Sequence, residues 1–275
     1  MNVAEATAYT RNKLLKINAS HEAKLIMQSV MNISLEELII NNGLKLNQDQ
    51  VDKLIYLLAQ RLCGKPLQYI LGRWSFMGIP MAVAKNVLIP RPETELLVEH
   101  AIEYCEKNNY NDILDLCTGS GCIAISMAHF LDVSVVASDI SPYALSLANQ
   151  NVLENQLQDK IKVVESDMFS NINQTFDLII SNPPYIISDE IPTLMDEVKN
   201  NEPLLALDGG KDGLDFYWII AADASKYLNP NGSVILEVGD KQSKSVAQLL
   251  DAAGFSEIEI FKDYSGIERI VKGTI

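Results

Sequence analysis

The hydrophobic pattern divides the chain into an all-helical part and a part in which strands alternate with helices. Through about residue 63, apolar side chains recur at helical spacing. The clearest run is Val51, Leu54, Ile55, Leu58 and Leu62. Four helices are expected, with candidate N-caps at Asn2 or Ala4, Ser20, Ser34 and Asn47. These residues predict a small helical bundle that ends near Gly64.

The pattern changes twice after the bundle. Residues 67 to 88 mix aromatic and β-branched side chains with glycines and a proline, which predicts a β-hairpin. A helix is then expected to run to about Asn108. The expected strands are Asp112–Leu116, Val133–Ser138, Ile161–Glu165, Phe176–Ser181, Ser233–Val238, Ile258–Phe261 and Arg269–Lys272. Helices are expected between most of them, including Ile123–Phe130, Pro142–Glu154, Phe216–Leu228 and Lys241–Ala253.

Apolar strands that alternate with helices are typical of an α/β fold with a doubly wound, mostly parallel sheet. We therefore expect three parts. Residues 1–66 form a helical domain, residues 67–90 a β-hairpin linker, and residues 91–275 the α/β domain.

Composition narrows the function. The formal net charge is −14 and no Lys/Arg-rich run occurs, which disfavours a protein that grips nucleic acid. A protein or small-molecule substrate is favoured instead. No apolar run approaches the ~20 residues of a membrane span, and the N-terminus lacks the blocks of a signal peptide. We expect a cytoplasmic protein with no membrane partner.

Cysteine and histidine usage argues against a metal centre. The four cysteines, Cys63, Cys105, Cys117 and Cys122, form no CxxC pair, so reduced thiols are expected. The three histidines lie far apart. This disfavours a histidine metal site and a Ser-His-Asp hydrolase.

The most informative motif follows the expected strand Phe176–Ser181. It reads Asn182, Pro183, Pro184, Tyr185. Proline fixes φ, lacks an N–H group and keeps the preceding residue out of the helical conformation. Asn182 is therefore held extended, with its side chain and nearby carbonyls at the strand end. Two acceptors there suit a planar –NH2 group, whose face Tyr185 can cover; the alternative is a rigid turn without function.

A second motif is the small-residue loop between the strand Asp112–Leu116 and the following helix. Gly119 and Gly121 let the backbone approach a ligand, and the helix beyond offers free N–H groups. Cys117 stands where the dinucleotide pattern GxGxxG has its first glycine. The loop alone is therefore a weak signal, and an ordinary strand-to-helix turn is the alternative.

Two acidic residues strengthen the case for a nucleoside site. Asp139 ends the next strand, ~20 residues after the loop, where an acid can accept both ribose hydroxyls. A helix cap ahead of Ser141 is its alternative role. Asp167 follows the strand Ile161–Glu165 and could bond an adenine amino group, or it could be a solvated turn residue. Ligands bind at such carboxyl ends in open α/β sheets.

The chain resembles the release-factor glutamine N5-methyltransferases, the PrmC/HemK family, over nearly all of its length. The matching stretches are Leu88–Glu95, Leu114–Ile125, Ser138–Leu145, Ser166–Ser170, Phe176–Ile186, Glu202–Leu214, Leu236–Gln242 and Ser265–Val271. The Asn-Pro-Pro-Tyr motif is shared with several classes that methylate amide or amino nitrogens. The Arg-Pro-Glu-Thr-Glu block and the Ala-Leu-Asp-Gly-Gly block together are more specific.

The resemblance implies a seven-stranded S-adenosylmethionine-dependent methyltransferase sheet with an antiparallel last strand. It implies S-adenosylmethionine as methyl donor, S-adenosylhomocysteine as product and no metal. The acceptor would be the glutamine of the Gly-Gly-Gln loop of peptide chain release factors, and the helical domain would recognise that partner. A monomer that binds no nucleic acid directly is expected.

The same resemblance implies the site residues. Donor-binding residues would be Cys117, Thr118, Gly119, Ser120, Gly121, Asp139, Met168 and Asn182. Catalytic and substrate-binding residues would be Asn182, Pro183, Pro184 and Tyr185. Two positions depart from the family: Cys117 replaces a commoner glycine, and Met168 stands where a larger aromatic residue is frequent.

Several rival functions are weighed against this one. A glutamine methyltransferase that acts on a ribosomal protein shares both motifs, and the Arg-Pro-Glu-Thr-Glu block disfavours it. An amino-methylating nucleic-acid enzyme is disfavoured by the charge of −14. A catalytically silent binding module is disfavoured by the intact Asn182–Tyr185 motif, and an oxidoreductase by the absent GxGxxG spacing.

Overall fold

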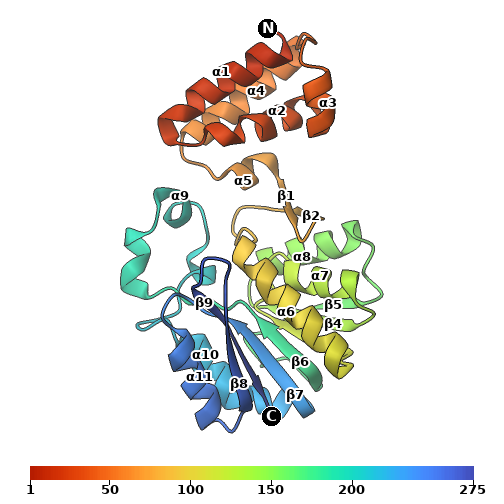
Figure 1. Cartoon of the computed structure of the whole chain (residues 1–275), viewed down its shortest axis with the longest axis vertical. Helices are drawn as coiled ribbons and strands as arrows, with labels where there is room; N and C mark the ends of the chain where they lie inside the picture. The colour runs from red at the N-terminus through yellow and green to blue at the C-terminus, as the bar shows by residue number, and fades with distance from the viewer. The chain divides into compact units, whose positions relative to one another are not determined.

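The computed structural model describes all 275 residues, and the chain forms two compact units (Figure 1). The helical unit contains Met1–Gly72 together with the short segment Asp196–Asn201. The catalytic unit contains Arg73–Met195 and Glu202–Ile275. The three-part division at residues 66 and 90 stays a prediction, and the sequence gives no sign that a segment near residue 200 joins the helices.

The helical unit is built on well-capped helices. Its main helices are α1 (Val3–Leu14), α2 (Ala23–Met31), α3 (Leu35–Ile40), α4 (Gln48–Leu62) and α5 (Leu67–Leu71). Asn2, Ser34 and Asn47 cap their helices, as predicted, and each forms a capping box, which was predicted for Ser34. The expected cap at Ser20 is wrong. Ser20 is itself the first residue of the 3₁₀ turn η2 (Ser20–Glu22), so it lacks the extended backbone of an N-cap.

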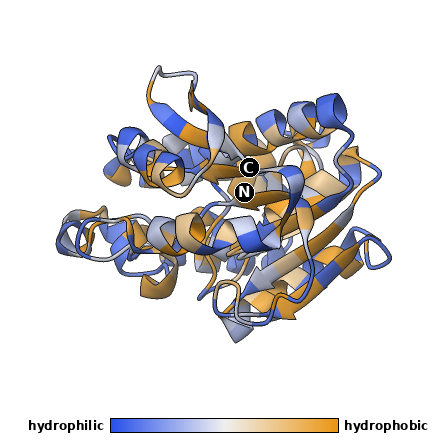
Figure 2. Ribbon diagram, turned by 90° about the horizontal axis from the view of Figure 1, so that it is seen from below, coloured by the Kyte–Doolittle hydropathy of each residue, from blue (hydrophilic) through white to orange (hydrophobic).

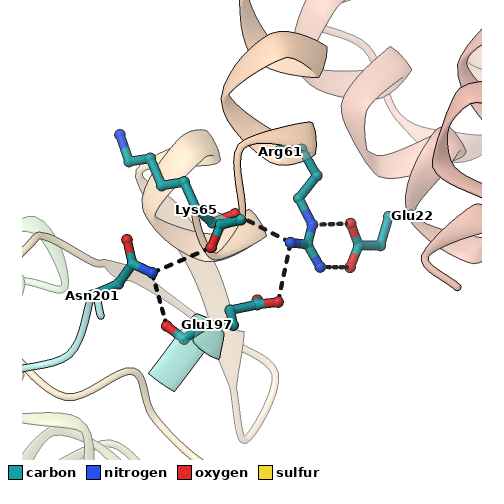
Figure 3. Close-up of polar contacts among 6 residues, drawn as sticks. Glu22, Arg61, Lys65, Glu197 and Asn201 are labelled. Carbon is teal, nitrogen blue, oxygen red and sulfur yellow. Dashed lines mark hydrogen bonds and ion pairs between the residues drawn. The ribbon is translucent and has the colours of Figure 1, made fainter. Parts of the chain in front are cut away.

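A buried arginine organises the end of α4 (Figure 3). Arg61 Nε lies 2.6 Å from Glu22 Oε2, and its Nη2 donates to Oε1 at 2.9 Å. Its Nη1 lies 3.0 Å from the carboxylate of Glu197, which belongs to α9 (Asp196–Lys199). Asn201 donates its side-chain N–H to the Gly64 carbonyl. These contacts explain why residues 196–201 belong to the helical unit.

The catalytic unit contains the expected seven-stranded sheet, in the order β5-β4-β3-β6-β7-β9-β8. The strands are β3 (Asp112–Leu116), β4 (Ser134–Asp139), β5 (Ile161–Glu165), β6 (Phe176–Ser181), β7 (Leu228–Glu237), β8 (Ser256–Lys262) and β9 (Glu268–Thr274). The first five strands in that order are parallel, and β9 is antiparallel to both neighbours. The fold class and the antiparallel last strand are confirmed.

Successive strand residues face opposite sides of the sheet and feed two separate cores. Ile113 and Ile180 pack on one side, and Leu114 and Ile179 pack on the other. Figure 2 accordingly shows much of the sheet in the hydrophobic colour, with hydrophilic residues interspersed. The helices are α6 (Pro92–Asn108), α7 (Cys122–Phe130), α8 (Pro142–Glu154), α10 (Asp215–Asp223) and α11 (Ser243–Ala252). None of the helices of the chain is long and apolar enough to span a membrane.

The expected hairpin is shorter than predicted. It consists of β1 (Arg73–Phe76) and β2 (Ile79–Ala82), whereas Leu67–Leu71 is the helix α5. Pro66 precedes this single turn, and Gly72, with φ of 70°, ends it by donating its N–H to the Gln68 carbonyl. These local stop signals outweigh the β propensity of the aromatic and branched residues between them.

Candidate active site

A cavity of about 450 Å³ opens at the carboxyl ends of the parallel strands. The loops after β3, β4, β5 and β6 supply one part of its wall. Residues 86–94 and 203–206 supply another part. Among the lining residues are Cys117, Thr118, Gly119, Ser120, Asp139, Asp167, Met168, Asn182 and Pro184. Predicted site residues from four separate strand ends therefore lie around one cavity.

The loop after β3 passes close to the cavity in an unusual backbone conformation. Cys117, Gly119 and Gly121 have φ of 62°, 56° and 82°. A Cβ at Gly121 would lie 3.3 Å from the Ala148 side chain, so helix α8 packs too closely there for a larger residue. Cys117 adopts the left-handed conformation at an energetic cost that glycine avoids. Cys117 therefore occupies a backbone conformation that favours the glycine commoner in the family.

A buried carboxylate holds this loop from below. Asp115 Oδ2 accepts hydrogen bonds from the Thr118 hydroxyl and from the Ala124 N–H. Its other oxygen, Oδ1, is buried without a partner. Burial raises the pKa of Asp115 to about 7. Asp115 is not among the predicted site residues, because an acid inside an apolar strand carries no periodic signal of its own.

Asp139 connects two strand ends at the cavity. Its Oδ2 accepts from Gly119 N at 2.9 Å, and its Oδ1 accepts from Ser141 N at 2.9 Å. Burial raises its pKa. Helix α8 is capped by Ser141, so the alternative of Asp139 as the N-cap is wrong. Each carboxylate oxygen can accept further hydrogen bonds, so both oxygens retain capacity for ribose hydroxyls.

The loop after β5 brings Asp167 and Met168 to the same cavity. Met168 is 7% exposed, and its Sδ lies 3.9 Å from Cys117 Sγ. The two departures from the family pattern therefore touch each other. A methionine is flexible and polarizable enough to pack against a flat ring. Contact between Met168 and adenine stays a prediction.

The Asn-Pro-Pro-Tyr motif follows β6, as predicted. Asn182 lines the cavity, and its Nδ2 donates to Thr94 Oγ1 at 2.9 Å. Pro183 and Pro184 are buried, and Tyr185 is partly buried. Pro183 and Tyr185 do not line the cavity itself. Burial raises the pKa of the Tyr185 hydroxyl, which therefore stays protonated.

The Asp-Gly-Gly loop explains how the motif is held. Ile186 N donates to the Leu207 carbonyl, and Gly209 N donates to the Ile186 carbonyl. A Cβ at Gly209 would lie 2.7 Å from Tyr185 Cα, so only glycine allows this close approach. Gly209 thus allows the Asp-Gly-Gly loop to pack directly against the motif, a role that was not predicted from the sequence.

Four further polar residues support the site and were not predicted from the sequence. Thr94 donates to Glu237 Oε2 at 2.6 Å, and Arg91 pairs with Glu202. All four fall within blocks that carry the family resemblance, which was the one available signal. Each pair joins segments more than 100 residues apart in the chain, so local pattern does not reveal the contacts.

The cavity has the groups that an S-adenosylmethionine molecule requires. Asp139 offers a carboxylate for ribose hydroxyls, the loop after β3 offers backbone groups, and Met168 contributes to the apolar wall. The sheet order, the loop and the strand-end acid together define the class. The protein is a methyltransferase of the α/β type.

Comparison with known proteins gives the family. Residues 92–209 match the model of the methyltransferase small domain, and residues 5–72 match the PrmC N-terminal domain. The release factor glutamine methyltransferase of Thermodesulfovibrio yellowstonii is 41% identical over 254 residues, which cover 91% of this chain and 90% of that protein. The one from Clostridium acetobutylicum is 39% identical over 91% of this chain and 89% of its own. The chain belongs to the release factor glutamine methyltransferase family.

Solved structures of low identity agree on the fold. A methyltransferase from Pyrococcus furiosus superposes with a TM-score of 0.54 at 19% identity, covering 81% of this chain and 98% of that one. The catalytic domain of hMettl16 superposes with a TM-score of 0.60 at 19% identity, covering 79% and 81%. At this identity the likeness concerns the fold alone.

Proposed function

We propose that this protein transfers a methyl group from S-adenosylmethionine to the side-chain amide nitrogen of the glutamine in the Gly-Gly-Gln loop of peptide chain release factors. The observation that carries the proposal is the orientation of Asn182. Its –NH2 group is bound by Thr94. Its carbonyl oxygen is therefore directed away from Thr94 and is available to accept from a substrate amide. The names of the curated relatives support the same substrate.

The donor would be held by the residues around the cavity. Asp139 would accept the ribose hydroxyls, and the loop from Cys117 to Gly121 would contact the amino-acid end. Met168 and Asp167 would flank the base. When bound, S-adenosylmethionine supplies an electrophilic methyl group.

The chain's own contribution is mainly positioning. Asn182 Oδ1 and the Pro183 carbonyl would accept the two hydrogens of the glutamine amide, which aims its nitrogen at the methyl-binding side of the cavity. These acceptors also stabilise the positive charge that develops on that nitrogen. Tyr185 would pack against the amide plane. No strong base is needed, because a cationic amide loses its proton readily.

The helical unit would recognise the release factor. Matching of residues 5–72 to a family-specific domain supports a role beyond packing. We further propose that the enzyme acts as a cytoplasmic monomer, and that no nucleic acid is bound directly.

Methyl transfer to purified release factor tests the proposal. Labelled S-adenosylmethionine is mixed with the enzyme and with native release factor, or with a copy whose loop glutamine is replaced by alanine. Label on the native factor only is expected. Label on both factors would place the modified residue elsewhere. Absence of label on either factor, with donor binding intact, would favour a ribosomal protein as substrate, and nucleic acid would be tested next.

A further inference from the structure

Glu237 is a buried carboxylate that no cation pairs with. It is 1% exposed, at the end of β7, and it takes part in no salt bridge of the structure. Ser181 pairs with Leu236 in the parallel register of β6 and β7, so Asn182 and Glu237 follow at neighbouring strand ends. A buried, unpaired acid is costly to stability. Its position beside the Asn-Pro-Pro-Tyr motif indicates that a role in the active site offsets this cost.

A chain of hydrogen bonds joins this acid to Asn182. The Thr94 hydroxyl donates to Glu237 Oε2 at 2.6 Å and accepts from Asn182 Nδ2 at 2.9 Å. Thr94 is 2% exposed. Water therefore does not compete freely for these bonds.

The direction of the chain follows from hydrogen counting. A threonine hydroxyl has one hydrogen. When Glu237 accepts that hydrogen, Thr94 can only accept from Asn182. The asparagine must then turn its –NH2 toward Thr94 and its carbonyl oxygen away. The opposite orientation would place two unpartnered N–H groups where a glutamine amide also presents N–H groups.

The other carboxylate oxygen of Glu237 bonds to Tyr185, the last residue of the motif. Tyr185 donates its hydroxyl to Glu237 Oε1 at 3.4 Å. Tyr217, which is fully buried, donates to the backbone carbonyl of Glu237 at 2.8 Å and fixes the acid in place. One carboxylate thus contacts Tyr185 directly and Asn182 through Thr94.

We propose that Thr94 and Glu237 are positioning residues, which fix the amide of Asn182 with its carbonyl oxygen toward the substrate glutamine. This inference rests on the proposed function. A purely structural role fits the observations less well, because a whole buried polar pair can often be replaced by apolar groups of similar shape at little cost in stability. The network also ends on the two residues of the motif that have polar side chains.

Three threonine variants test the proposal. Thr94→Val keeps the shape and removes the hydroxyl, Thr94→Ser keeps the hydroxyl, and Thr10→Val makes the same change at a buried helix threonine of the other unit. The hydroxyl of Thr10 donates to the Ala6 carbonyl of its own helix. The measurements are kcat and KM for release factor, the Kd for S-adenosylmethionine, and the thermal midpoint.

Thr94→Val is expected to lower kcat by about 10- to 100-fold with the donor Kd unchanged, since a misdirected acceptor misplaces the nucleophile. Thr94→Ser should recover most of that loss, and Thr10→Val should stay near wild type. An active wild type with a Thr94→Val variant of equal kcat would overturn the inference alone. Equal losses of kcat in Thr94→Val and Thr94→Ser would also overturn the inference alone. An inactive wild type would instead overturn the proposed function, and the inference with it.

Discussion

Arg91 Nη2 lies 2.6 Å from Glu202 Oε1, which joins the segment before α6 to the segment that follows α9. The carboxylate also lies 3.5 Å from Ile89 N. The Glu202 side chain is 2% exposed, whereas that of Arg91 is 31% exposed. Arg91 and the neighbouring residues 203–206 line the cavity. The ion pair therefore links the two sequence blocks that are most specific to the family, at the wall of the site.

Loss of the arginine should destabilise the catalytic unit. Arg91→Met leaves Glu202 buried without its partner, and we expect a loss of about 3 kcal/mol, the lower value for such a change, because Arg91 is itself partly exposed. Urea unfolding followed by the fluorescence of Trp74 and Trp218, which both belong to this unit, measures the loss. The double variant Arg91→Met/Glu202→Leu should recover stability. A single variant as stable as wild type would contradict the prediction.

The contacts of Arg61 should differ in strength. Glu22→Ala leaves a buried guanidinium without its two-point partner, and we expect a loss of roughly 3–5 kcal/mol. The side chain of Glu197 is 36% exposed, so Glu197→Ala should lose at most about 1 kcal/mol. Circular dichroism during urea unfolding measures both units together, and tryptophan fluorescence follows the other unit separately, because this unit contains no tryptophan. Similar losses in both variants would contradict the prediction and show that Arg61 holds α9 as firmly as it holds η2.

Much of the fold could be predicted from local pattern. The strands Asp112–Leu116, Ile161–Glu165 and Phe176–Ser181 have the predicted bounds, because short apolar runs between turn residues are strong signals. The position of Asn182 after a strand follows from those bounds. Asp139 was expected just after the strand Val133–Ser138 and is the last residue of β4. The prediction that Leu67–Leu71 belongs to the β-hairpin was wrong, because a single helical turn is too short to show a helical period.

The buried polar pairs could not be predicted. In the sequence, Glu237 is a single acid within the predicted strand Ser233–Val238, and Thr94 is a single residue near the start of a predicted helix. Their partnership depends on packing between α6 and β7, across 143 positions of sequence. The same holds for Glu22 and Arg61, which are 39 positions apart on different helices. The hydrophobic pattern predicts which face of a helix or strand is buried. The partners of the polar groups on that face are known only from the tertiary structure.

Substitutions at Asp139 and Asn182 should separate donor binding from catalysis. Asp139→Ala removes the proposed ribose acceptor and an anchor of Gly119, so the Kd for S-adenosylmethionine should rise at least tenfold. Asn182→Ala should lower kcat by about 10²-fold or more with a near-normal donor Kd, because it removes one acceptor for the reacting amide. Calorimetric titration of the donor and single-turnover methylation measure the two effects. An unchanged donor Kd in Asp139→Ala would move the ribose contact to another residue.

Stability should fall as pH rises through the range set by Asp115. Burial raises its pKa from 3.8 to about 7. Between these values the folded protein binds a proton that the unfolded chain has released, so the folded state is favoured at the lower pH. The contribution is complete below about pH 3.8 and is lost as pH rises through about 7. Chemical unfolding at several pH values measures it, and Asp115→Asn should make the trend shallower, with the remainder due to Glu237, whose pKa is also raised to about 7. An identical trend in that variant would assign the effect to other groups.

Activity should show the opposite pH dependence, set by Glu237. Burial raises the pKa of this acid to about 7. The charged groups that face it are Glu93 on α6 and Arg269 on β9, and the neutral hydroxyls of Thr94 and Tyr185 donate to it. When the acid is protonated it can donate to Thr94, whose own hydrogen is then free to turn toward the Asn182 carbonyl oxygen. The orientation that the substrate needs is thereby lost.

We therefore expect kcat to fall as pH decreases through about 7, with the donor Kd nearly constant. Glu237→Gln cannot ionise, so its lower kcat should be flat over the same range. Asp115→Asn serves as the matched control: it removes the other acid with a pKa of about 7 and should keep the wild-type inflection. Single-turnover methylation of release factor from pH 5.5 to 8.5 measures the three profiles. An inflection that survives in Glu237→Gln and disappears in Asp115→Asn would assign the pH dependence to the loop after β3 instead of the Asn182 network.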